Sequence, residues 1–276
     1  MTAGGSSGGE GALVALRGSC LGMGTDIAGS VRIPALCCGI YGFRTSLDRI
    51  PYGGQMKPAR DGMAGIKGGA GPLTNYAEDM QLAMETIFNA DPWGMDQSAL
   101  FAPYRKVESK RKLRLGLIME DPDIPLQPPT LRTINEVVKT LEGAGHEIVP
   151  ITKFPSIYAA LKLAFHFFGM DTAGTPFANI SSSGEPRIPS IATSLLPKEE
   201  WIEANLDNLY DLNIQRDEYK SKFRDIFMSH ELDAFIMPGN AGPAQPHDTY
   251  GLPPYTVFLN FLDVCYLKSS KNEPKS

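Results

Sequence analysis

The segment between residues 113 and 151 constrains the fold more strongly than any other part of the chain. Residues 113–119 alternate in hydrophobicity, as the residues of a strand do. An amphipathic helix is then expected to open near Thr130 and to stop at Gly143 and Gly145, with an apolar face of Leu131, Ile134, Val137, Val138 and Leu141. Residues 147–151 favour a second strand. This order predicts a βαβ unit, so we expect an α/β fold with a mixed β-sheet core flanked by helices.

Shorter patterns predict the remaining elements. Helices are expected at residues 10–16, 76–88, 157–170 and 199–227, and a helix or turn at residues 31–36. Strands are expected at residues 21–25, 39–43 and 235–238, the last two as buried strands. Residues 181–189 and 239–254 favour loops. Because roughly the first seventy residues are rich in glycine and poor in charge, we expect the chemistry to lie there.

Composition excludes several classes of function. The chain has 276 residues with 26 Lys and Arg against 31 Asp and Glu, and it has no basic stripe, so nucleic acid is not an expected partner. No apolar run reaches the ~18 residues of a membrane span. No CxxC or HExxH motif is present, so we expect neither a metal nor a cofactor. Four irregularly spaced cysteines favour a reducing, cytoplasmic compartment: Cys20, Cys37, Cys38 and Cys265.

Two short segments near the start of the chain carry the chemical signal. Gly4-Gly5-Ser6-Ser7-Gly8-Gly9 places two hydroxyls between four glycines, which lets other groups approach both serines closely. The second segment runs from Gly24 to Pro34 as Gly-Thr-Asp-Ile-Ala-Gly-Ser-Val-Arg-Ile-Pro and contains Ser30. A glycine-rich serine loop alone is most often a turn, so the signal depends on the combination of the two segments.

Together these segments resemble the amidase signature family, serine hydrolases that cleave amides with a triad of Ser, cis-Ser and Lys. The resemblance runs from Gly4 through Gly42, and the spacing of 24 positions between Ser6 and Ser30 also fits the family. It implies that Ser30 is the acyl-enzyme nucleophile and that Ser6 is the bridging serine, with a cis peptide bond. The implied reaction is hydrolysis of a linear carboxamide to a carboxylic acid and ammonia, with a small-molecule amide as the partner.

The resemblance also implies roles for the neighbours of Ser30. The backbone N–H groups of Ile27, Ala28, Gly29 and Ser30 would form an oxyanion hole beside Ser6. Asp26 and Arg32 flank the nucleophile, and we expect them to pair and hold the turn rather than to act on substrate. Ser7 either forms a hydrogen bond near the triad or fills space.

A catalytic lysine is the part of the triad that is not found. In this family it lies well upstream of the Gly-Gly-Ser-Ser loop, whereas this chain begins three residues before that loop. Lys57 and Lys67 are the nearest candidates downstream, and both lie in polar, glycine-rich segments typical of solvated loops. Residues 232–262 resemble fungal acetamidase-like relatives, and the likeness stops after Leu262. We therefore expect a partial amidase domain over residues 1–276, with its signature region at 1–50 and its substrate side at about 151–262.

We expect a partial domain of this kind to be inactive alone and to associate with itself through exposed surface. A non-catalytic amidase remnant is the main alternative. An α/β-hydrolase is a weaker one, because Gly5-Ser6-Ser7-Gly8-Gly9 fits G-x-S-x-G with Ser7 as nucleophile but no strand precedes it. Its base would have to be one of the four histidines, His146, His166, His230 or His247. No phosphate-binding glycine motif supports a nucleotide site. Aliphatic, aromatic and fatty amides all remain open as substrates.

Overall fold

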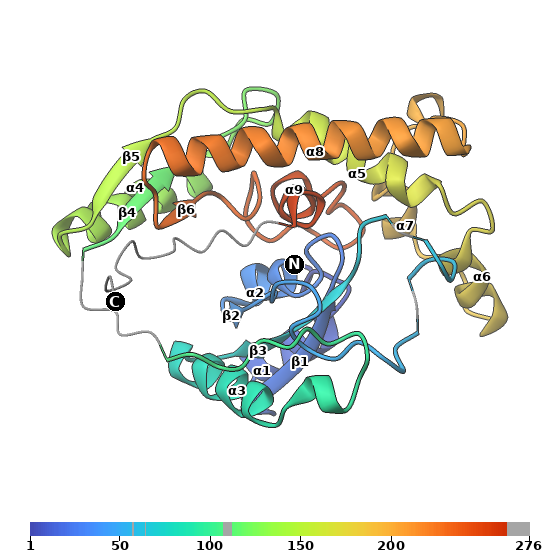
Figure 1. Ribbon diagram of the computed structural model, residues 1–276, viewed down its shortest axis with the longest axis horizontal. Coiled ribbons are helices and arrows are strands. Elements are labelled where there is room, and N and C mark those ends of the chain that lie inside the picture. The colour runs from blue at the N-terminus through green and yellow to red at the C-terminus, as the bar shows by residue number, and fades with distance from the viewer. Residues whose placement is uncertain (57, 64, 107–111, 264–276) are drawn as a thin grey trace, which may run out of the picture.

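The structure is a computed structural model that describes residues 1–56, 58–63, 65–106 and 112–263 (Figure 1). Its strands are β1 (Leu21–Asp26), β2 (Tyr41–Gly42), β3 (Gly69–Thr74), β4 (Arg114–Leu117), β5 (Glu147–Pro150) and β6 (Ala234–Ile236). Its α-helices are α1 (Gly8–Ala15), α2 (Arg32–Cys38), α3 (Ala77–Asn89), α4 (Pro128–Gly143), α5 (Ile157–Gly169), α6 (Thr175–Ser182), α7 (Pro189–Thr193), α8 (Leu206–Ser229) and α9 (Pro254–Leu262). The described strands form two three-stranded sheets, so the fold is α/β.

The parallel sheet has the order β5-β4-β6 and contains the expected βαβ unit. Strand β4 pairs in parallel with both neighbours, and α4 connects β4 to β5. The crossover is required because parallel strands cannot be joined by a tight turn. Figure 1 places this sheet in the upper half of the molecule together with α4, α5 and α8. The prediction for residues 113–151 is therefore confirmed.

The second sheet is antiparallel, with the order β1-β3-β2, and its central strand was not predicted. Strand β3 has the sequence Gly-Ala-Gly-Pro-Leu-Thr, and all six residues are buried. Two glycines and a proline depress β-propensity, which explains why the pattern was missed. The Pro72 carbonyl accepts a hydrogen bond from Phe43 N at 3.0 Å, so Pro72 still takes part in the sheet as an acceptor. Parallel and antiparallel pairing thus occur in separate sheets.

Several expected boundaries were wrong for local reasons. Residues 39–43 form only the two-residue strand β2 and are not buried, because Gly39 ends α2 in the left-handed region and Tyr41 is 53% exposed. The strand at residues 235–238 is half-buried and ends at Ile236. Helix α8 begins at Leu206 rather than at residue 199, since the Asn205 side chain caps it by accepting from Asn208 N at 2.8 Å. The expected helices at 10–16, 31–36, 76–88 and 157–170 are present with small shifts.

The main hydrophobic core forms where α5, α8 and α9 meet. All but one residue of α9 is buried, although this helix was not predicted. Its Phe258 ring lies 4.8 Å from that of Phe223 on α8, in an edge-to-face contact. Figure 1 shows α9 at the centre of the molecule, between α8 above and α2 below. Helix α9 therefore brings residues near the end of the described chain next to residues among its first seventy.

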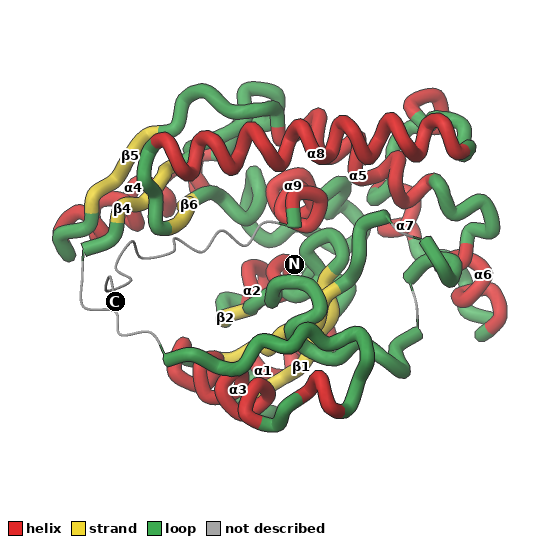
Figure 2. Tube along the Cα trace, viewed as in Figure 1, coloured by secondary structure: helices red, strands yellow, loops and turns green. Residues whose placement is uncertain are grey.

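The long connection from β2 to β3 contains no helix or strand in its described residues, as the green tube in Figure 2 shows. Among the described residues, no helix combines the length and the hydrophobicity needed to cross a membrane.

We predict that Gly71→Ala lowers the free energy of unfolding by about 2 kcal/mol or more, because a Cβ at residue 71 would lie 1.8 Å from the Phe43 carbonyl oxygen. Gly143→Ala at the end of α4 is the matched control, since its Cβ would meet nothing within 4 Å. Urea titrations of both variants measure the difference. Equal stability of the two variants would show that β3 does not approach residue 43 this closely.

Candidate active site

The two predicted serines meet at one cavity of about 570 Å³, whose walls include both Ser6 and Ser30. Ser7 N donates to the Ser30 carbonyl at 3.1 Å and joins the two segments directly. The Gly5–Ser6 peptide bond is cis. Ser30 is half-buried and Ser6 is exposed. Residues 24 positions apart are thus brought to the same surface.

Ser30 lies in the turn that connects the end of β1 to the start of α2. Gly29 has a φ of +121°, a conformation that side chains with a Cβ rarely adopt, so glycine is required at that position. Ser30 follows at once, and the Gly29 carbonyl accepts from Ile33 N at 2.7 Å in the first turn of α2. We refer to residues 26–31 as the Ser30 turn.

Asp26 and Arg32 form the ion pair that the sequence predicted. Arg32 donates from Nε and Nη2 to the two carboxylate oxygens of Asp26, at 3.0 and 2.9 Å. Asp26 is fully buried and also accepts from Val31 N at 3.2 Å. Burial by itself raises the pKa of Asp26, but the hydrogen bonds and charge of Arg32, with bonds from Asn260 and Val31, outweigh it and lower that pKa. The carboxylate therefore stays ionised and holds the turn.

The four residues predicted to supply oxyanion donors differ in their hydrogen-bond partners and in the cavity that they line. Gly29 N donates to Asp26 Oδ1 at 2.9 Å, so this amide already has a partner within the turn, and its role as an oxyanion donor stays a prediction. Ile27 lines a neighbouring cavity of about 380 Å³ rather than the cavity of Ser30. Ala28 and Ser30 line the Ser30 cavity, and within the described residues neither N–H donates to another protein group. Ala28 and Ser30 are therefore the available donors.

The Ser7 side chain forms hydrogen bonds with the backbone of Thr25. Its hydroxyl donates to the Thr25 carbonyl at 3.4 Å and accepts from Thr25 N at 3.3 Å. Ser7 lines a different cavity from His247, which is the one histidine on the described walls of the Ser30 cavity. The geometry therefore gives no support to an α/β-hydrolase with Ser7 as nucleophile.

The remaining walls of the Ser30 cavity come from distant parts of the chain. Its apolar side chains are Ile33, Phe165, Ile188, Ile191, Leu195 and Pro253. Polar groups at the cavity come from the segment around α7 and from residues 247–250; Ser190 Oγ donates to Asp248 Oδ1 at 2.6 Å. Burial raises the pKa of Tyr250, so its hydroxyl stays neutral. The cavity is suited to an uncharged ligand with an apolar part.

No lysine lines this cavity among the described residues. Lys67 is 59% exposed and pairs with Asp48 at 3.4 Å, and it lines the cavity of Ile27 instead. Lys57 lies outside the described residues.

Ser6 also lines a second cavity of about 540 Å³, which includes Glu10. Within the described residues no cluster of His, Cys, Asp and Glu could hold a metal ion.

Two residues that touch the Ser30 turn were not predicted, Thr256 and Asn260 of α9. Both are buried, and they lie one helical turn apart in a helix that is otherwise apolar. Buried polar groups are rarely left unpaired, so two polar residues spaced i, i+4 in an apolar stretch were the available signal. The signal failed because α9 itself was not predicted.

We predict that Asp26→Asn lowers the free energy of unfolding by about 3–5 kcal/mol at neutral pH, because it leaves the Arg32 charge without its partner. The pKa of Asp26 is lowered by folding, so its stabilisation is present above the ordinary aspartate pKa of about 3.9 and is lost as the pH falls below it. Urea titrations at several pH values should show a smaller acid loss in the variant than in the wild type. Asp225→Asn, at a surface pair, is the control. An unchanged stability for Asp26→Asn would contradict the role of this carboxylate.

Comparison with known proteins agrees with this geometry. The family model described as Amidase matches residues 1–272. An amidase of Gibberella moniliformis is 34% identical over 265 residues, covering 95% of this chain and 50% of that protein. An acetamidase of Emericella nidulans is also 34% identical, over 94% of this chain and 49% of that protein.

Among solved structures, a fatty acid amide hydrolase superimposes with a TM-score of 0.89 at 29% identity, covering 95% of this chain and 46% of that one. A bacterial aryl acylamidase has the same fold, with a TM-score of 0.67 at 22% identity. The chain spans about half the length of the curated relatives it matches. From its sequence match, its fold and the meeting of the two serine segments, the chain belongs to the amidase family.

Proposed function

We propose that this chain forms the nucleophile side of an amidase site that hydrolyses linear carboxamides to carboxylic acid and ammonia. The observation that supports it most strongly is the shared cavity of Ser6 and Ser30, beside the available N–H groups of Ala28 and Ser30. Residues 1–50 would act as the signature region and residues 151–262 as the substrate side of one partial domain, because both stretches contribute walls to this cavity.

Ser30 is the proposed nucleophile and Ser6 the proposed proton relay. As Ser30 Oγ attacks the carbonyl carbon, its proton passes to Ser6, and the Ser6 proton passes to a neutral amine. The N–H groups of Ala28 and Ser30 would stabilise the oxyanion of the tetrahedral intermediate. The C–N bond then breaks and ammonia leaves with a proton returned through the same relay. Water hydrolyses the acyl ester and regenerates Ser30.

The second cavity beside Ser6 is our proposed position for the amine. Its walls contain the hydroxyls of Ser6 and Ser7, which suits a primary amine that donates to oxygen atoms. A lysine can accept a proton only when its surroundings lower its pKa below the ordinary value of about 10.4. Because no lysine lines this cavity among the described residues, we propose that these residues alone give little turnover.

The substrate class follows from the apolar wall of the Ser30 cavity. Ile33, Phe165 and Ile191 offer apolar surface to the acyl group, and burying such surface is favourable by about 25 cal/mol per Å². We therefore propose an uncharged amide with an apolar acyl group.

Cys20, Cys37 and Cys38 are free, which supports a reducing compartment such as the cytoplasm.

We predict that a fluorophosphonate labels Ser30 and that an added primary amine accelerates the reaction. The experiment uses ethylamine near pH 10, where part of it is neutral, with tetramethylammonium chloride at equal ionic strength as the control. Mass spectrometry gives the rate and the labelled residue. Ser30→Ala should remove labelling, Ser6→Ala should slow it about 100-fold and abolish the amine effect, and Ser19→Ala should change nothing. Labelling that persists in Ser30→Ala would assign the nucleophile to another residue, and no labelling with amine present would favour a non-catalytic remnant.

We also propose self-association through the edge of the antiparallel sheet. Among the described strands β1 pairs only with β3, and Leu21 and Met23 on β1 are 38% and 42% exposed. An apolar sheet edge favours pairing with another chain. We predict that Met23→Lys reduces the apparent mass in light scattering after gel filtration, relative to Lys139→Arg on α4. A wild-type chain that elutes as a monomer at high concentration would refute this proposal.

A further inference from the structure

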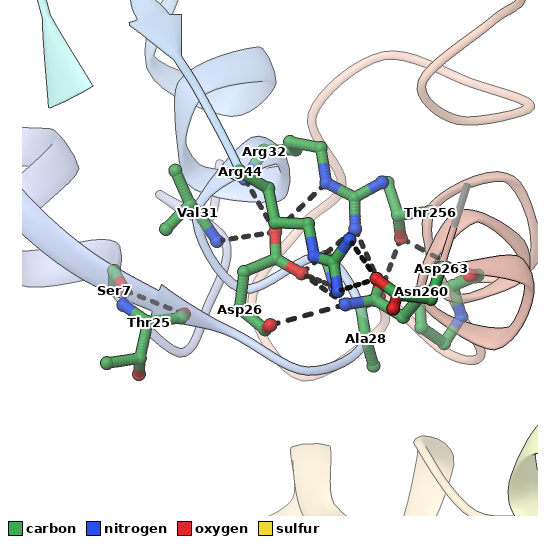
Figure 3. A network of polar contacts seen from close by, with 12 residues as sticks. Ser7, Thr25, Asp26, Ala28, Val31, Arg32, Arg44, Thr256, Asn260 and Asp263 are labelled. Carbon is green, nitrogen blue, oxygen red and sulfur yellow. Dashed lines mark hydrogen bonds and ion pairs between the residues drawn. The ribbon is translucent and has the colours of Figure 1, made fainter. Parts of the chain in front are cut away.

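Helix α9 contacts the Ser30 turn through two buried polar side chains (Figure 3). Thr256 Oγ1 donates to the Ala28 carbonyl at 2.8 Å. Asn260 Nδ2 donates to Asp26 twice, to the carbonyl at 3.2 Å and to Oδ1 at 2.9 Å, while its Oδ1 accepts from Arg32 Nη2. These bonds span 228 to 234 positions of sequence, so α9 is an independent element docked on the turn.

The Thr256 bond acts on one particular peptide group. The carbonyl of Ala28 and the N–H of Gly29 belong to the same planar unit. Thr256 holds the oxygen end of this unit at 2.8 Å, and Asp26 Oδ1 holds the nitrogen end at 2.9 Å. A planar group held at both ends has a fixed orientation. The N–H groups of Ala28 and Ser30 belong to the two flanking peptide units, which join this unit at the Cα atoms of Ala28 and Gly29, so holding it restricts how far those units can turn.

Gly29 makes this contact possible. A Cβ on residue 29 would lie 2.2 Å from Thr256 Oγ1, far inside the contact distance of real atoms. The absence of that Cβ opens the space into which the Thr256 hydroxyl fits. The glycine is therefore needed for the approach of α9 as well as for its positive φ.

Helix α9 is itself held firmly, so it can serve as a fixed support. Phe258 and Phe261 are 1% and 0% exposed in the main core. Arg216 Nε donates to the Phe261 carbonyl at 2.6 Å, and Arg44 pairs with Asp263, just after the helix, at 3.2 Å. Asn260 locks Asp26, which is the other anchor of the peptide. Both ends of the Ala28–Gly29 peptide are thus tied to the same buried helix, one directly and one through Asp26.

We propose that Thr256 is a positioning residue for the proposed amidase site: its hydroxyl fixes the Ala28–Gly29 peptide so that the N–H groups of Ala28 and Ser30 face the cavity. This inference rests on the proposed function for its catalytic consequence, while the fixed peptide is a property of the structure alone. Thr256 does not line the Ser30 cavity, so it acts through the turn and not on substrate.

The test replaces Thr256 with Val, which keeps the shape and removes the hydroxyl, and with Ser, which keeps the hydroxyl. The control is Thr133→Val on the exposed side of α4, where the hydroxyl donates to the Pro129 carbonyl at 3.1 Å. Two quantities are measured. One is the deuterium uptake of the peptide spanning residues 26–31. The other is fluorophosphonate labelling of Ser30 with ethylamine present, resolved into its maximal rate and its half-saturating probe concentration.

We expect Thr256→Val to speed exchange in residues 26–31 and to lower the maximal labelling rate by about 10- to 100-fold, with the half-saturating concentration unchanged. Thr256→Ser should restore both quantities, and Thr133→Val should change neither. Unchanged exchange and rate in Thr256→Val would overturn the proposal, as would a Thr256→Ser variant impaired as badly as Thr256→Val. If wild-type Ser30 is not labelled at all, the proposed function fails, and the exchange data alone still decide whether Thr256 fixes the turn.

Discussion

The buried carboxylate of Asp26 is the interaction on which the rest of the site depends. It accepts hydrogen bonds from backbone amides of the Ser30 turn and from the side chains of Arg32 and Asn260. An ionised group without solvent is costly unless every lone pair is used, and here the turn itself supplies the donors. Satisfying one charge therefore dictates the path of the chain around Ser30. The shape of the turn is a consequence of electrostatics more than of local propensity.

The site is also a meeting point of regions far apart in sequence. Residues 2–6 and 28–33 supply the side of the cavity that contains Ser6 and Ser30, while residues 165–253 supply most of its apolar wall. Helix α9 contacts the turn and connects it to the main core. The two serines and most of the apolar wall thus lie on different segments of the chain. This division is consistent with relatives named for different amides within one fold.

The sequence predicted the parts of the fold that carry a periodic pattern. The βαβ unit and helices α3 and α5 follow from regular spacing of apolar residues, and Ser6 and Ser30 follow from two glycine-rich motifs. Strand β3 was missed because Gly69, Gly71 and Pro72 hide its burial, which only the neighbouring strands create. Helix α9 was missed because a fully buried helix has no polar face to give a period. The engagement of Gly29 N by Asp26 depends on backbone geometry that no residue pattern expresses.

We propose that Ser30 faces a cavity beneath the N–H groups of Ala28 and Ser30. A crystal structure of the chain treated with a fluorophosphonate tests it most directly. We predict a bond from phosphorus to Ser30 Oγ, with the phosphoryl oxygen accepting hydrogen bonds from the N–H groups of Ala28 and Ser30. An adduct on Ser6 or Ser7, or a phosphoryl oxygen turned away from these two amides, would contradict the account.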